Sequence, residues 1–72
     1  MPKKIRELKS LLLKAGFKCK PGKGSHTKWS HPLFSGRLTL PGKDGSDAKA
    51  YQEQDVYEAI QQVENQQNQE KS

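Results

Sequence analysis

The sequence predicts an α+β domain in which two helices lie on one face of a three-stranded antiparallel sheet. Apolar residues recur at spacings of three and four near both ends of the chain, which is the period of an amphipathic helix. Between these ends, three short segments alternate apolar and polar residues, which is the period of a strand. The connections between the strands are short, so we expect an antiparallel meander in the order helix, strand, strand, strand, helix.

The first helix is expected over residues 4–15. Its apolar side chains would form one stripe, made of Ile5, Leu8, Leu11, Leu12 and Ala15. Gly16 follows directly, and glycine is the usual residue for a left-handed C-terminal cap.

Three strands are expected at residues 17–20, 26–31 and 37–40. In the first, Phe17 and Cys19 would form an apolar face and the lysines between them a basic one. In the second, Thr27 and Trp29 share a face, and we expect Trp29 to point into the core. The turn-forming residues between these segments separate the strands.

The second helix is expected from about Gln52 to Val63, with Val56, Ala59 and Ile60 on its apolar face. The polar sequence beyond Val63 has no apolar residue that could anchor it. We therefore expect one domain over residues 1–64 and a disordered polar tail over residues 65–72.

The composition indicates a small cytoplasmic domain. A chain of 72 residues buries only roughly 60% of its unfolded surface, so the core must be small. Cys19 is the only cysteine, which excludes an intramolecular disulfide. The sequence has no apolar run near the ~20 residues of a membrane span, so we expect no membrane association.

Positive charge is concentrated in the first two-thirds of the chain. Residues 1–50 contain 12 of the 13 Lys and Arg residues against three acids, a net charge of +9, whereas residues 51–72 have one Lys against five acids, a net charge of −4. The strand alternation would gather several cations on the sheet face away from the helices, namely Lys18, Lys20, Lys28 and Arg37. A polyanion is the expected partner.

The segment from Pro21 to His26 is the most unusual part of the sequence. Its two glycines allow close approach of a ligand to the backbone, although glycine-rich hairpin loops are common. His26 follows directly, and a histidine can take and give a proton near neutral pH, as RNA cleavage by an attacking 2′-hydroxyl requires. Lys23 and Lys28 would stabilise charge on the phosphate oxygens. The same residues fit phosphate binding, or an ordinary loop in which His26 only begins a strand.

The other candidate residues have more ordinary interpretations. We expect Ser25 to shape the loop, because no hydrolase motif surrounds it. Trp29 is more typical of a core residue than of a base-stacking platform. His31 lies on the opposite face from His26 by alternation, so a zinc site or an acid–base pair is not expected. We interpret His31 as a strand terminus whose imidazole satisfies backbone groups, and we expect no cofactor.

These residues resemble the HicA family of toxins. Gly16-Phe17 and Gly24-Ser25-His26 match the family pattern in identity and spacing, and the similarity continues through Trp29 and His31-Pro32 to the last helix. The resemblance implies a double-stranded-RNA-binding-domain-like fold, metal-independent cleavage of mRNA, and neutralisation by a HicB-type antitoxin that covers the active face. It also implies that His26 is the catalytic residue.

Combining the resemblance with the charge pattern gives a predicted RNA-binding set, which consists of Lys18, Lys20, Lys23, Gly24, Ser25, Lys28 and Arg37. Two positions depart from the family pattern. Pro21-Gly22 stands where many members have polar or basic residues, and Gly42-Lys43 follows Pro41 where many have a second histidine. A non-catalytic RNA-binding module is therefore the alternative function. A protein-interaction domain that works through the acidic, Gln-rich end is a third.

Overall fold

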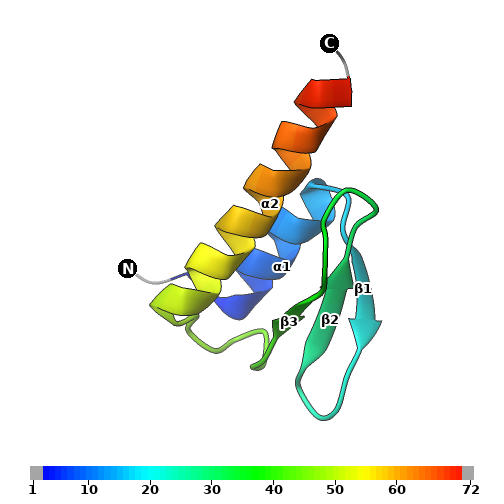
Figure 1. Cartoon of the computed structure of the whole chain (residues 1–72). Coiled ribbons are helices and arrows are strands. Elements are labelled where there is room, and N and C mark those ends of the chain that lie inside the picture. Colours follow the sequence, from blue (N-terminus) through cyan, green and yellow to red (C-terminus); the bar gives the residue numbers. More distant parts are fainter. Residues whose placement is uncertain (1–2, 71–72) are drawn as a thin grey trace.

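A computed structural model of the chain describes residues 3–70 and has the predicted order of elements (Figure 1). The elements are α1 (Ile5–Lys14), β1 (Lys18–Pro21), β2 (Thr27–Ser30), β3 (Leu38–Leu40) and α2 (Ala50–Glu70). The three strands form one antiparallel sheet in the order β1-β2-β3. The structure thus confirms the α+β layout of two helices and a three-stranded meander.

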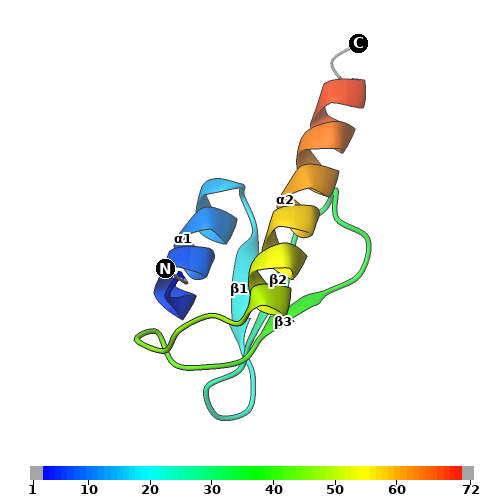
Figure 2. The same cartoon turned by 90° about the vertical axis from the view of Figure 1, so that its left-hand side faces the viewer.

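Both helices pack on the same face of the sheet, as Figures 1 and 2 show. The core between the two layers is built from buried aliphatic side chains of α1 and α2 and from Phe17, Trp29, Leu38 and Leu40. Trp29 is only 2% exposed, and its indole N–H donates to the Thr27 hydroxyl at 2.9 Å. The prediction that Trp29 points into the core is confirmed. Among residues 3–70, no helix covers the opposite face of the sheet.

A capping motif at the end of α1 sets the direction of β1. Gly16 has a φ of +93°, and its N–H donates to the Leu13 carbonyl while the N–H of Phe17 donates to the Leu12 carbonyl, both at 3.0 Å. This pair of hydrogen bonds is the Schellman arrangement, which needs a left-handed residue where Gly16 stands. Phe17 is buried, so the chain is anchored immediately before β1 begins.

Gln52 links the sheet to α2 and was not predicted as a core residue. Its amide nitrogen donates to the Pro41 carbonyl at 3.0 Å, and its amide oxygen accepts from the backbone N–H of Lys49 at 2.7 Å. The side chain is 5% exposed. Gln52 therefore joins the end of β3 to the first turn of α2 through a buried polar bridge.

Two sequence predictions differ from the structure. Cys19 lies opposite Trp29, on the helix-facing side of the sheet as predicted, but it is exposed rather than buried, because β1 is the edge strand of the sheet. The second helix continues past Val63 to Glu70, so residues 65–70 are helical and not a disordered tail. Glutamine and glutamate are good helix formers, and they extend an existing helix without tertiary contacts. Residues 71–72 of the expected tail, like residues 1–2 of the expected domain, lie outside the described residues.

Candidate nucleic-acid interface

The face of the sheet away from the helices is basic. In the register, Lys18 lies opposite Ser30, Lys20 opposite Lys28, and Lys28 opposite Thr39. Residues that lie directly opposite each other point to the same face, and Trp29 next to Lys28 points into the core, so these residues occupy the uncovered side. We call this surface the open face: Lys18, Lys20, Lys28, Ser30 and Thr39, together with Arg37 just before β3.

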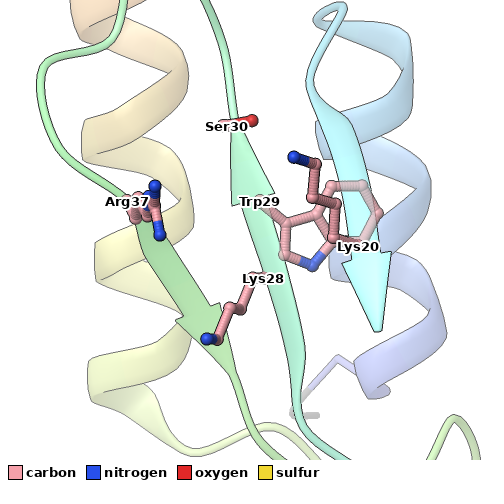
Figure 3. Close-up of a pocket in the computed structure, with 5 residues that line it drawn as sticks. All are labelled: Lys20, Lys28, Trp29, Ser30 and Arg37. Atoms are coloured by element: carbon pink, nitrogen blue, oxygen red, sulfur yellow. The ribbon is translucent and has the colours of Figure 1, made fainter. Parts of the chain in front are cut away.

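A shallow depression lies within the open face. It has a volume of about 160 Å³ and is lined by Lys20, Lys28, Trp29, Ser30 and Arg37. Figure 3 shows that its basic side chains come from the central strand β2 and from both of its neighbours, β1 and the start of β3. The alternation of the sequence predicted that these cations would share a face, and the structure brings them together. Trp29 is almost fully buried, which leaves no ring surface for stacking on a base.

The β1–β2 hairpin turn presents the next group of predicted site residues. The N–H of His26 donates to the Lys23 carbonyl at 3.0 Å, and the N–H of Gly22 donates to the His26 carbonyl at 2.9 Å. Gly24 has a φ of +59°, whereas Ser25 does not have a positive φ. A positive φ at the first central position of a turn favours glycine, because other residues rarely adopt it. Gly24 and Ser25 thus shape the turn, and Lys23, Gly24 and Ser25 are all exposed.

His26 is exposed at the start of β2. The bond from Gly22 to His26 continues the strand register one position beyond the pair Pro21 and Thr27, which places His26 in line with Lys28 on the open face. The imidazole Nδ1 lies 3.2 Å from the Lys23 carbonyl oxygen. A carbonyl can only accept a hydrogen bond, so this contact favours the hydrogen on Nδ1. In a neutral ring, Nε2 then has a free lone pair.

His31, in contrast to His26, makes contacts that stabilise the fold. Its Nδ1 accepts a hydrogen bond from the backbone N–H of Leu33 at 3.0 Å, and its ring packs against Phe17 with a centroid separation of 5.2 Å. The side chain is half-buried at the end of β2 opposite to His26. The prediction that His31 satisfies backbone groups in the turn is confirmed, and the two imidazoles are not brought together.

Gly42, in the loop between β3 and α2, lies close to α1. Gly42 has a φ of +112°, and a Cβ built on it would lie 3.3 Å from Cγ1 of Ile5, a buried residue of α1. Any larger side chain would be strained at this backbone conformation and would press on the first turn of α1. The glycine therefore allows the β3–α2 loop to approach the first turn of α1 closely.

The ion pairs of residues 3–70 lie away from the open face. Lys4 pairs with Asp47, and Lys9 pairs with Asp44. The first pair joins the residue before α1, and the second joins α1 itself, to the β3–α2 loop, where the Ile5 N–H also donates to the Ser46 carbonyl at 2.9 Å. Within this described range, the cations of the open face have no carboxylate partner, so their charge is available to an external anion.

The fold and this surface define a small α+β domain with one buried and one basic sheet face, in the layout of double-stranded-RNA-binding-like folds. A family model described as the HicA toxin of bacterial toxin-antitoxin matches residues 5–63. The chain therefore belongs to the HicA toxin family, which makes it the toxin component of a toxin–antitoxin system. No curated protein and no solved structure gives a significant match. Neither helix within residues 3–70 combines the length and the apolar character needed to cross a membrane.

Proposed function

We propose that this protein is a metal-independent endoribonuclease that cleaves mRNA with His26 as the general base. The main support for the proposal is the position of the His26 imidazole. Its Nδ1 is held at the Lys23 carbonyl, 3.2 Å away, and the exposed ring lies in line with Lys28. This leaves Nε2 free to accept a proton from a ligand on the open face.

The reaction follows from these groups. Nε2 of His26 takes the proton of a ribose 2′-hydroxyl, the 2′-oxygen attacks the adjacent phosphorus, and the bond from phosphorus to the 5′-oxygen breaks. Water gives the leaving 5′-oxygen its proton, and the product has a 2′,3′-cyclic phosphate end. Lys23 and Lys28 stabilise the charge that develops on the phosphate oxygens. The remaining cations of the open face would bind the flanking backbone.

The test is incubation of purified protein with RNA in EDTA. We expect cleavage by the wild type, none by His26→Ala, and none when the substrate has 2′-deoxyribose at the cleaved position. Ser35→Ala is the control and should cut like the wild type, because Ser35 is exposed in the β2–β3 connection, outside the predicted RNA-binding set. Full cutting by His26→Ala, or cutting of the deoxy position, would refute the mechanism.

The second candidate function is RNA binding without cleavage, and one observation favours it. The other histidine of the sequence, His31, is half-buried and accepts a hydrogen bond from the Leu33 N–H, so no second imidazole lies beside His26 to act as the general acid. RNA that is bound with strong salt dependence but stays intact would support this function over the first.

We further propose a HicB-type antitoxin as the protein partner and the cytoplasm as the location. The open face is the surface that such a partner would have to cover in order to block RNA. Co-expression with the product of a neighbouring short reading frame should remove both RNA binding and toxicity. A complex that leaves RNA binding unchanged would refute this mode of neutralisation.

A further inference from the structure

The depression on the open face is lined by positive charges that repel one another and therefore do not stabilise the fold. Lys20 and Lys28 are a direct cross-strand pair, and like charges at directly opposite positions repel each other. If the register of β2 and β3 is continued by one residue, Arg37 falls opposite Ser30. Three cations, from β1, β2 and the residue before β3, therefore line one depression together with the Ser30 hydroxyl (Figure 3).

None of these cations is neutralised by a neighbouring acid within residues 3–70. The ion pairs described there join a lysine of α1 and the lysine before it to the β3–α2 loop. Lys20, Lys28 and Arg37 are all exposed. An uncompensated cluster of this kind is typical of a site whose counter-ion is a ligand.

The size of the depression limits what can fill it. Pockets for small-molecule ligands usually enclose roughly 300–1,000 Å³, whereas this one has about 160 Å³. It is too small for a whole nucleotide and suits a single ionic group. A guanidinium, two ammonium groups and a hydroxyl are all donors for phosphate oxygens.

The depression lies apart from His26 along the same strand. Lys28 and Ser30 follow His26 by two and four residues, which corresponds to about 7 and 13 Å at the rise of a β-strand. A phosphate in the depression is therefore a different phosphate from one at the His26 imidazole. An RNA strand that runs along β2 would reach both positions.

We propose that Lys20, Ser30 and Arg37 form a second phosphate subsite, which binds an RNA phosphate at a distance from the scissile one, and that Lys28 lies between the two phosphates. The inference rests on the proposed function in that the ligand is taken to be RNA. It adds Ser30 to the site, as a hydroxyl that donates to the bound phosphate. It also assigns Arg37 a specific partner, namely one phosphate of the strand rather than the RNA as a whole.

The test uses a single-stranded 2′-O-methyl RNA, which cannot be cleaved by 2′-hydroxyl attack, with one phosphate at a time replaced by an uncharged methylphosphonate. In the wild type, we expect one position away from the His26 phosphate at which the replacement weakens binding by roughly tenfold. In Arg37→Gln that position should become insensitive, because its charge partner is gone, and Ser30→Ala should reduce the same effect. Lys43→Gln, which removes an exposed lysine outside the open face, should keep the wild-type pattern. Identical patterns in the wild type and Arg37→Gln would overturn the subsite.

A second measurement separates this inference from the proposed function. Inorganic phosphate titrated into the labelled wild-type protein should shift the amide resonances of Lys20, Ser30 and Arg37, whether or not the protein cleaves RNA. Shifts at these residues without any RNA cleavage would leave the subsite standing and refute the nuclease. Absence of these shifts, or shifts with glutarate but not with phosphate, would overturn the subsite, and the glutarate result would indicate an acidic protein partner.

Discussion

Removing one charge from the cross-strand pair of Lys20 and Lys28 should stabilise the free protein and weaken RNA binding. The two side chains lie directly opposite each other on adjacent strands, where a like-charged pair costs roughly 0.2–1 kcal/mol. Lys20→Gln should therefore raise the free energy of unfolding by about 0.5 kcal/mol, a middle value of that range. For a domain of this size, such a gain corresponds to an increase in Tm of roughly 2–4 °C.

A double-mutant cycle isolates the repulsion. If Lys20→Gln and Lys28→Gln each relieve the same pair, the double variant should gain less than the sum of the single gains. Thermal unfolding at low salt is the assay, and at 1 M NaCl the gain should vanish because charges are screened beyond about 3 Å. Lys43→Gln is the matched control and should leave Tm nearly unchanged. A lower Tm for Lys20→Gln at low salt, or an equal gain in the control, would refute the reasoning.

The same variants should bind RNA more weakly, in a salt-dependent way. Each phosphate of a single strand that the protein no longer neutralises makes the slope of log K against log salt shallower by about 0.7. Lys28→Gln should therefore show a shallower slope than the wild type, as measured by fluorescence anisotropy. A stabilised variant with an unchanged slope would show that the pair repels but does not bind RNA.

Four further predictions concern the scaffold of the site. Trp29→Ala should lower the free energy of unfolding by about 3–5 kcal/mol in urea denaturation, because it leaves a cavity in the core; a loss under about 1 kcal/mol would contradict its central place. Gly24→Ala should cost about 1 kcal/mol, because its φ is +59°, whereas Gly45→Ala, which has open space and no positive φ, should be nearly neutral; equal effects would refute the turn assignment. Gln52→Ala should cost about 1–3 kcal/mol by leaving the bridged backbone groups unpaired, and a neutral result would mean that water replaces the amide. Removal of residues 67–72 should reduce helical circular dichroism but change the free energy of unfolding by less than about 0.5 kcal/mol, and a larger loss would reveal packing by the end of α2.

The element order could be predicted because the periodicities in this sequence are clear. The spacing of Ile5, Leu8 and Leu12 indicates a helix without knowledge of what the helix packs against. Gly16 marks the end of this helix, because it has a backbone conformation that other residues rarely adopt. The alternation around Trp29 fixed which side of β2 is buried. The cations of the open face followed from that same alternation.

Other features depend on tertiary context, and local sequence does not contain it. Cys19 has the alternation of a buried residue, but its exposure depends on β1 being an edge strand. Gln52 looks like a surface residue of an amphipathic helix, and its burial depends on the Pro41 carbonyl lying within reach. Ser30 lies two residues after Lys28 and therefore on the same face of β2, but only the pairing of all three strands shows that it borders a depression.

One face of β2 contributes to the core and the other to the proposed binding surface, and the strand register determines which residues lie on each face. Trp29 is buried and its neighbours Lys28 and Ser30 face outward, so a shift of one residue would expose the indole and bury the lysine. The Trp29 indole donates to the Thr27 hydroxyl, which in turn donates to the Leu40 carbonyl at 3.2 Å. This chain of hydrogen bonds ties β2 to β3 in one register only, and the tight turn at Gly24 does the same between β1 and β2. The buried contacts on one side of β2 therefore allow only this strand register, and this register places the basic residues together on the open face.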